Sequence, residues 1–411
     1  MNDLPDGWEW TTLGDIAKVV GGVTKDSKKQ ADPSLSEVPY LRVANVQRGY
    51  LDLQEVTTIR VPEATLQKLR LLPGDILFNE GGDRDKLGRG WVWEGQVPDC
   101  IHQNHVFRAR IRPDEYDPKF ISMYGNSLGR KWFEDHGKQT VNLASISLST
   151  LKGLPVPQIP LYEQQKIVAA IEEQFSRLDA GVAALRRAAQ TIKRMRDALF
   201  QLTIPQKSEN WELVTIDDSI RVVDYRGRTP PFSAVGIPHL RSFNVKDGRV
   251  NWDGCAWVTE ETYDKYMSRG LPSSDDLLFT TEAPMGEVAP APDKKFCMAQ
   301  RMMLLKPDLA TWLPEYLMYH FRSPWFQARL RLNATGTTVQ GISSRNFRPL
   351  RLYAPPLAIQ EMLASQIREN LSVIQDLERE LQVASARSRQ LRIAILASAF
   401  SGKLVLEEIT A

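Results

Sequence analysis

The sequence has few of the residues that build disulfide-linked or metal-stabilised folds. Its three cysteines, Cys100, Cys255 and Cys297, are an odd number, lie far apart and form no CxxC motif. We therefore expect buried free thiols and neither a disulfide framework nor a structural zinc site. Of the five histidines, only His102 and His105 are close neighbours, and residues three apart on a strand face opposite sides, so we expect no metal site there.

Long apolar runs and blocks of one charge are also missing. No stretch reaches the roughly 18 apolar residues needed to span a bilayer, and the opening MNDLPDGWEW lacks the basic start and apolar run of a signal peptide. We therefore expect a cytoplasmic protein. The net charge is only +2, which is low for a protein that binds nucleic acid alone through many phosphate contacts. DNA binding would need local charge or a partner that shares the contacts.

The motifs of methyl-transferring and nucleotide-hydrolysing enzymes are absent. The tetrapeptide of adenine methyltransferases (Asn or Asp, Pro, Pro, aromatic) does not occur, because the only double prolines stand in TPPF and APPL. The glycine-rich EGGDRDKLGRG lacks the GK[ST] ending of a phosphate-binding loop. No Ser-His-Asp or Cys-His arrangement can be recognised. We therefore expect no catalytic residue in this chain.

The main positive feature of the sequence is one long internal repeat. Trp8 in GWEWTTLGDIAKVV recurs as Trp211 in NWELVTIDDSIRVV, VPYLRVANV recurs as IPHLRSFNV, and PGDILFNEGG recurs as SDDLLFTTEA, in the same order. Further along, Gln103 in IHQNHVF matches Gln300 in MAQRMML, and QTVNLASIS matches TTVQGISSR. Finally, LPVPQIPLYEQQ matches LYAPPLAIQ. The chain therefore consists of two copies of one unit.

Each copy begins with a segment of mixed character. Residues 1–160 and 202–356 are rich in short apolar runs bounded by Gly, Pro, Asp and Asn, such as 38–46, 75–79 and 105–111. Such runs are typical of strands, while helical periodicity is present but less common. We predict one mixed α+β domain in each segment.

Each copy ends in a long amphipathic stripe. Apolar residues recur at steps of three and four over 167–199 and again over 363–395. The pattern predicts helices of about forty residues, some 60 Å long at 1.5 Å per residue, within 161–201 and 357–411. One such helix is unstable alone, so we predict that the two pair antiparallel and hold the domains at opposite ends of a rod. Two unrelated surface helices, each lying on its own domain, are the alternative.

Taken together, these features resemble the specificity subunit of type I restriction-modification systems. The resemblance rests on LPDGWEWTTLGDIAKVVGG, VPYLRVANV, GDILFNEGG and above all PVPQIPLYEQQKIVAAIEEQFSRLD. It spans the whole chain and implies target-recognition domains at 1–160 and 202–356. It also implies that the helices at 161–201 and 357–411 act as spacers and dock partners.

The resemblance further implies a non-catalytic protein that reads a bipartite duplex DNA site, one half per recognition domain. Such a subunit carries two DNA-methyltransferase subunits and, through them, restriction-translocase subunits. The complex, used by prokaryotes against phage, is an adenine-N6 DNA methyltransferase and ATP-dependent endonuclease. S-adenosylmethionine, ATP and Mg²⁺ would bind the partners, and no cofactor would bind this chain. Two other functions stay open: a coiled-coil assembly scaffold without direct DNA reading, and the recognition half of a fused methyltransferase-nuclease.

Several loops have the composition needed for DNA reading, since Arg and Lys suit guanine, Asn and Gln suit adenine, and cations or hydroxyls suit phosphates. In the first domain the candidates are Arg42, Gln47, Arg48, Asn79, Arg84, Lys86, Arg89, Gln103, Asn104, Lys138 and Gln139. In the second domain they are Arg241, Lys246, Thr280, Thr281, Gln300, Arg301, Thr337, Thr338, Gln340 and Arg345.

Domains that read different half-sites should agree where they hold the fold and differ where they touch bases. Asn45 and Asn244 match in the repeat and are therefore predicted to be structural. Arg84 and Lys86, where the second copy has Ala and Pro, are better specificity candidates. The tryptophans that recur are predicted to be core anchors rather than stacking platforms: Trp8, Trp132, Trp211 and Trp325.

Overall fold

The computed structural model of the chain falls into two compact units, which are described separately. Unit 1 comprises residues 1–184 and 384–411, and unit 2 comprises residues 185–383. Each unit contains one α+β domain and a segment of each long helix. The structure describes residues 5, 7–139, 144–204, 210–225, 229–298, 301–336 and 339–403, with the backbone alone at Asp85 and Gln139.

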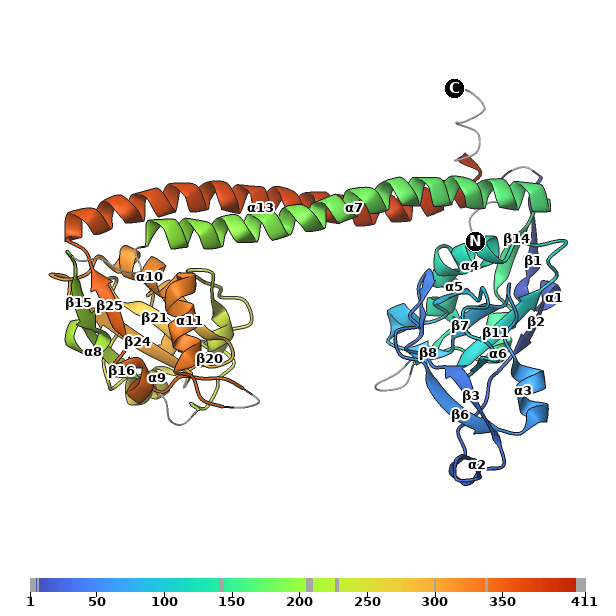
Figure 1. Cartoon of the computed structure of the whole chain (residues 1–411), viewed down its shortest axis with the longest axis horizontal. Helices are drawn as coiled ribbons and strands as arrows, with labels where there is room; N and C mark the ends of the chain where they lie inside the picture. The colour runs from blue at the N-terminus through green and yellow to red at the C-terminus, as the bar shows by residue number, and fades with distance from the viewer. Residues whose placement is uncertain are drawn as a thin grey trace. The chain divides into compact units, whose positions relative to one another are not determined.

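Two main sheets form the domain of unit 1 (Figure 1). The antiparallel four-stranded sheet has the order β2 (Ala17–Val20), β11 (Val106–Ile111), β7 (Ile76–Asn79), β9 (Gly90–Val92). The three-stranded sheet has the order β10 (Ile101–His102), β3 (Ser36–Leu41), β6 (Thr57–Val61), with β10 parallel to β3. Smaller sheets pair β1 (Glu9–Thr12) with β14 (Pro155–Gln158), β4 (Val46–Gln47) with β5 (Tyr50–Leu51), and β12 (Lys138–Gln139) with β13 (Ala144–Ser145) and β8 (Gly81–Gly82).

Short helices cover and connect these sheets. Asp117 caps α4 by accepting hydrogen bonds from two backbone N–H groups of its first turn, and Ser147 caps α6 in the same way with one. The helices of the domain are α1 (Leu13–Ile16), α2 (Ser27–Gln30), α3 (Glu63–Leu69), η1 (Arg84–Lys86), α4 (Pro118–Asn126), α5 (Gly129–His136) and α6 (Leu148–Lys152).

Unit 2 repeats this topology. Its antiparallel four-stranded sheet has the order β16 (Ile220–Asp224), β24 (Met302–Pro307), β21 (Leu277–Thr281), β22 (Met285–Pro290). Its three-stranded sheet has the order β20 (Ala256–Val258), β17 (Ile237–Leu240), β23 (Cys297–Met298), and β15 (Glu212–Thr215) pairs with β25 (Arg351–Ala354), as β18 (Val245–Lys246) does with β19 (Arg249–Val250). The helices are α8 (Ile216–Ser219), η2 (Ser242–Asn244), α9 (Glu260–Tyr266), α10 (Pro314–Arg322), α11 (Pro324–Leu332) and α12 (Ser344–Phe347). The predicted internal repeat is therefore a repeat of fold.

The long helices are α7 (Leu161–Thr203) and α13 (Leu357–Phe400). In unit 1, Ile167 and Ile171 of α7 share a core with Phe400, and Asp179 pairs with Arg392 of α13. Residue numbers therefore rise along one helix as they fall along the other. This antiparallel arrangement confirms the predicted pair and excludes two unrelated surface helices.

The same arrangement recurs in unit 2, where Arg196 of α7 pairs with Glu378 of α13. Ile192 and Phe200 of α7 lie in one apolar core with Leu371 and Ile374 of α13. Helix α13 has 44 residues and lies within the predicted range 357–411. It ends at Phe400, two residues before Gly402, which has a φ of 75°, a conformation that glycine adopts without strain.

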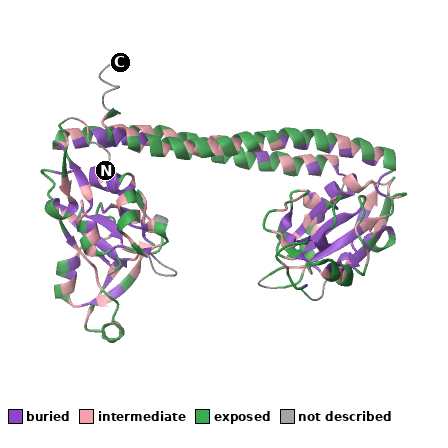
Figure 2. Ribbon diagram, turned by 180° about the vertical axis from the view of Figure 1, so that it is seen from behind, coloured by how far each residue is buried: buried purple, intermediate pink, exposed green. Residues whose placement is uncertain are grey.

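Buried residues concentrate in the sheets of each domain and in the parts of the long helices that pack on them (Figure 2). Of the recurring tryptophans, Trp8, Trp132 and Trp325 are only half-buried and lie at the margins of the cores. Trp93 and Trp312, which do not recur, are the fully buried ones. Among the described residues, no helix is long and apolar enough to cross a membrane, and no group of His, Cys, Asp and Glu could hold a metal ion.

Candidate nucleic-acid interface

Each domain holds its first candidate loop with a buried asparagine. Asn45 accepts a hydrogen bond from the backbone N–H of Arg42 at 2.8 Å. Its Nδ2 donates to the carbonyl oxygens of Asp52 and Glu55, both at 2.9 Å. Asn244 makes the equivalent three hydrogen bonds in unit 2, at 2.9, 2.9 and 3.2 Å. The prediction that this asparagine is structural is confirmed.

The candidate loops of the first domain lie together in one group, here called loop cluster 1: residues 42–48, 79–89, 103–105, 138–139 and 144–145. Asn79 donates from Nδ2 to two carbonyl oxygens of the 42–48 loop, at 3.2 and 2.8 Å. The N–H of Glu80 donates to the carbonyl of His105 at 2.9 Å, and the carbonyl of Glu80 accepts from Ile146 at 2.8 Å. Segments far apart in the sequence therefore form one continuous surface.

The second domain has the corresponding loop cluster 2: residues 241–246, 280–286, 301, 335–336 and 339–342. Ser242 joins the first two segments by donating from Oγ to the carbonyl of Ala283 at 2.9 Å. The N–H of Thr281 donates to the carbonyl of Arg301 at 2.9 Å, and the carbonyl of Thr281 accepts from Ile342 at 3.0 Å. Both domains thus build the surface from equivalent segments.

The candidate side chains differ in how far they reach solvent. The exposed ones are Arg84, Lys138, Lys246, Arg301, Gln340 and Arg345. The half-buried ones are Arg42, Gln47, Arg48, Lys86, Arg89, Gln103, Asn104 and Arg241. Some of the latter are held by neighbours, since Arg48 donates to the carbonyl of Asn126 at 2.9 Å and Arg42 lies 3.6 Å from Glu55. Each cluster therefore presents two exposed cationic candidates: Arg84 and Lys138 in cluster 1, and Lys246 and Arg301 in cluster 2.

Three candidates point into the protein. Asn79 and Thr280 are completely buried, and Thr281 is 3% exposed. The Oγ1 of Thr280 accepts a hydrogen bond from the N–H of Glu287 at 2.9 Å, which links β21 to β22. The hydrogen bonds of Asn79 fix the 42–48 loop in a comparable way. Their side chains do not reach the surface, and the prediction that they meet DNA is therefore not supported. Gln300, Thr337, Thr338 and the side chain of Gln139 lie outside the described residues.

The loop between β8 and β9 is the part in which the two clusters differ most. Arg84 is exposed and donates to the carbonyl of Glu134 at 3.2 Å. Lys86 pairs with Asp83, and this hydrogen bond lowers the pKa of the Asp83 carboxyl. The second domain has Ala283 and Pro284 in this place, so the two clusters present different charge to a ligand.

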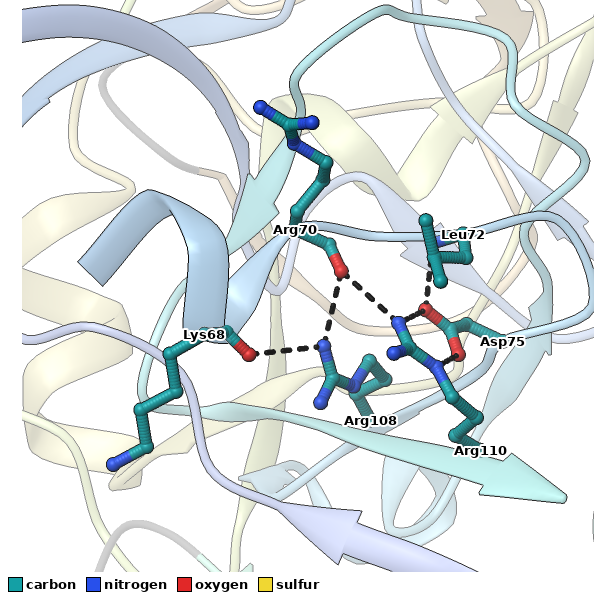
Figure 3. Close-up of polar contacts among 6 residues, drawn as sticks. All are labelled: Lys68, Arg70, Leu72, Asp75, Arg108 and Arg110. Carbon is teal, nitrogen blue, oxygen red and sulfur yellow. Dashed lines mark hydrogen bonds and ion pairs between the residues drawn. The ribbon is translucent and has the colours of Figure 1, made fainter. Parts of the chain in front are cut away.

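Two arginines of β11 bind the C-terminal end of α3 in the domain of unit 1 (Figure 3). Arg108 is 3% exposed and donates from Nη1 to the carbonyls of Lys68 and Arg70, at 3.4 and 3.0 Å. Arg110 donates from Nη2 to the carbonyl of Arg70 at 3.1 Å. These carbonyls end α3 and carry partial negative charge, which the guanidinium groups compensate. Burial lowers the pKa of Arg108.

The aspartate beside these arginines recurs in the second domain. Asp75 accepts two hydrogen bonds from Arg110, at 2.6 and 2.7 Å, which raise the pKa of that arginine. Asp276 pairs in the same way with Lys306. Both aspartates also accept a backbone N–H three residues earlier in the chain, at 2.7 and 2.8 Å. This ion pair therefore holds the segment that enters β7 in unit 1 and β21 in unit 2.

A buried glutamine fixes each domain to its long helix. In unit 1, Gln164 accepts a hydrogen bond from the N–H of Asp117 at 2.9 Å. Its Nε2 donates to the carbonyls of Glu115 and Ile159, at 3.0 and 2.9 Å. Sequence reasoning did not single out this residue, although its identity with Gln360 across the repeat was a usable signal.

Gln360 of unit 2 makes the same contacts. It accepts from the N–H of Leu313 at 2.8 Å, and it donates to the carbonyls of Thr311 and Pro355, at 2.7 and 2.8 Å. Both glutamines are completely buried. Each therefore ties three points of its unit together: the segment before α4 or α10, the strand leading to the long helix, and the first turn of that helix.

Comparisons with known proteins agree with this architecture. Residues 208–382 match the family model described as the type I restriction modification DNA specificity domain. A candidate specificity subunit of type I restriction enzyme MjaX from Methanocaldococcus jannaschii is 21% identical, over 96% of this chain and 94% of that protein. The type I restriction enzyme EcoKI specificity subunit of Escherichia coli (strain K12) is 24% identical, over 98% and 90%.

The fold also matches a solved structure. A chain of a type I R-M system, described for its complex assembly and conformational transition, superposes with a TM-score of 0.74 over 98% of this chain and all of the other, at 17% identity. At that identity the match establishes a shared fold. In the family model matched by its second half, in its full-length relatives and in its duplicated α+β architecture, the chain is similar to the specificity subunits of type I restriction-modification systems.

Proposed function

We propose that this chain reads a bipartite duplex DNA site, with one half-site read by each domain. The observation that carries the proposal is that each domain gathers equivalent segments into a loop cluster whose supporting residues recur, while its exposed side chains differ. Asn45 and Asn244 illustrate the first property, and Arg84 and Lys86 against Ala and Pro illustrate the second. A shared scaffold with different exposed side chains suits two domains that read different sequences.

The exposed cations of the clusters suit both parts of DNA recognition. Arginine presents a planar fork that can bond guanine or phosphate through two hydrogen bonds. Exposed Lys138 and Lys246 lie on short strands of the two clusters and suit phosphate contacts. Since the net charge of the chain is only +2, partner subunits would supply further phosphate contacts.

The long helices would set the unread gap and dock the partners. In α13, several apolar side chains are exposed despite the helix pairing: Val373, Leu377, Val383, Leu391 and Ile393. Val373 and Leu377 are one helical turn apart and can form a contiguous apolar patch, which is the kind of surface that marks a protein interface. We assign them to two methyltransferase subunits, through which restriction subunits join a cytoplasmic complex. S-adenosylmethionine, ATP and Mg²⁺ would bind those partners, and this chain would contribute no catalysis.

A domain exchange tests the proposal. Residues 1–160 are replaced by the matching domain of a relative, the complex is expressed in a methylation-free host, and methylated adenines are mapped across the genome. One half of the recovered motif should change and the other should stay. A change in both halves would contradict the assignment of one half-site to each domain, and an unchanged motif would favour a scaffold that does not read DNA. Methylation by the pure chain would favour a fused enzyme.

A further inference from the structure

A solvent-open cavity of about 730 Å³ lies in unit 2 beside loop cluster 2. Three arginines from separate elements line it: Arg329 of α11, Arg345 of α12 and Arg351 of β25. No acidic residue is among the described residues that line the cavity. The cavity therefore has the charge of an anion site.

These arginines are not neutralised within the described part of unit 2. None of the three forms an ion pair there, whereas the neighbouring Arg348 pairs with Asp217. Arg345 and Arg351 are exposed. Arg329 lies over the ring of Trp325, 4.7 Å from its centre, and this contact orients the guanidinium group. Three cations without counter-charges repel each other, and a bound anion would remove that repulsion.

The cavity borders the loops assigned to DNA reading. Thr335 lines it and exchanges two backbone hydrogen bonds with Gly341, at 2.8 and 2.9 Å. Gly341 in turn bridges to Glu282, whose carboxylate lies 3.7 Å from Arg301. An anion in the cavity would therefore lie next to a ligand held by loop cluster 2.

The first domain lacks this cationic set at the equivalent positions. Trp325 recurs as Trp132, but the residue four places later is Arg329 in one domain and His136, stacked at 3.6 Å on Trp132, in the other. In unit 2, Arg351 of β25 pairs with Thr215 of β15. In unit 1, Pro155 of β14 pairs with Thr12 of β1 in the same way, so Pro155 is the equivalent of Arg351. Arginine thus stands where the first domain has histidine and proline.

The third arginine differs in the same way. Ser343 and Ser147 cap α12 and α6 by accepting a backbone N–H three residues later, which aligns the two helices. In this alignment, Ser149 of the first domain is the equivalent of Arg345. Since all three positions differ, the cluster is a property of the second domain and is not required by the repeated fold.

We propose that this cavity binds one backbone phosphate of the DNA beside the half-site read by loop cluster 2. Guanidinium groups bond phosphate oxygens through paired, charge-assisted hydrogen bonds, and a cavity lined by three of them suits a single phosphate. The inference rests on the proposed DNA-reading function. It adds that the two domains hold the DNA backbone unequally.

The test compares two charge-matched double variants of the full chain, assembled with its methyltransferase subunit. Arg345→Gln/Arg351→Gln removes two exposed cations of the cavity. Arg221→Gln/Lys265→Gln removes two exposed cations of unit 2 that do not line it. Binding to a duplex carrying the mapped motif is measured over a range of KCl concentrations. The cavity variant should bind about tenfold more weakly, and its log–log salt slope should be lower by about 0.9, the value for one lost phosphate contact. The control should keep the wild-type slope and the motif should not change.

Duplexes with one neutral methylphosphonate identify the phosphate. At one position in the duplex, the methylphosphonate should weaken binding of the wild type and of the control. It should not weaken binding of the cavity variant, because that variant has already lost the contact with this phosphate. Equal slopes of the two variants would overturn the inference while leaving DNA reading intact. Loss of the methyltransferase subunit from the cavity variant, with unchanged DNA binding, would also overturn it and assign the cavity to an acidic partner. A wild-type complex that binds no duplex would overturn the proposed function itself.

Discussion

The substitution Gln164→Leu tests how a recognition domain is fixed to its long helix. It nearly keeps the side-chain volume but leaves the N–H of Asp117 and the carbonyls of Glu115 and Ile159 without their partner. A buried backbone group that loses its partner costs about 1 kcal/mol or more. Three such groups give a loss of about 3 kcal/mol, reduced to about 2 kcal/mol where leucine gains from apolar burial.

The expected result is a lower free energy of unfolding for unit 1 with a local loosening of α4. A loss of 2–3 kcal/mol lowers the melting temperature of a unit of this size by about 4–12 °C. Hydrogen–deuterium exchange should rise in residues 115–120 and 159–164. Peptides around Gln360, which keeps its own contacts in unit 2, serve as an internal reference.

The neighbouring residue provides a matched control. Gln165 is exposed, so Gln165→Leu makes the same chemical change one position along the same helix without stranding a buried group. It should leave the melting temperature within about 1 °C, since exposed substitutions shift stability by less than about 0.5 kcal/mol. Equal melting temperatures for the two variants, or unchanged exchange at Asp117, would refute the reasoning.

Lengthening α7 by one turn after Ala180 is expected to change the unread gap of the methylated motif and to leave both half-sites unchanged; an unchanged gap in the mapped motif would show that the helices do not set it. Burial lowers the pKa of His102, His239 and His320 from 6.5 to about 4, so the folded state favours the neutral rings. Their contribution to stability is therefore complete above about pH 6.5 and is lost as the pH falls toward 4, by about 1.4 kcal/mol per pH unit for each histidine. Urea unfolding at several pH values measures this loss. The variant His320→Phe replaces one of the three histidines in an aromatic environment and should reduce the dependence of the unfolding free energy on pH by the contribution of one histidine. An unchanged pH dependence would contradict the lowered pKa of His320. The isolated chain is expected to bind duplex DNA weakly and its methyltransferase complex to bind tightly and with steep salt dependence; equal affinities in filter-binding titrations would contradict this.

The long-range features of the fold could be predicted because they leave periodic or repeated signals. A stripe of apolar residues at helical spacing predicts a helix wherever it lies, and duplicated segments predict duplicated folds. The α+β domains and the antiparallel helix pair follow from these two signals. The last residue of α13 does not follow from the apolar stripe, because the stripe ends at Ile395 while the helix continues to Phe400, two residues before Gly402 in its positive-φ conformation.

The positions of single polar side chains could not be predicted in the same way. Asn79 and Thr280 stand at strand ends with polar neighbours, a context typical of exposed loops, yet residues distant in sequence cover both. Gln164 lies on an amphipathic helix, where a glutamine is usually solvated, and its partners come from the segment before α4 and from the strand before α7. Burial depends on which distant segments meet, and one sequence pattern does not specify that.

Comparing the two copies resolves part of this ambiguity. The buried polar residues that recur satisfy backbone groups in the same way in both domains, as Gln164 and Gln360 do. A backbone group left without its partner would cost free energy whichever DNA sequence the domain reads, so these residues resist change in both copies. Exposed residues such as Arg84 and Arg345 satisfy no such requirement and can differ at little cost to the fold. Identity across the repeat therefore marks the buried residues that hold each domain together, and differences at exposed positions of equivalent backbone are where we expect the two domains to contact different half-sites.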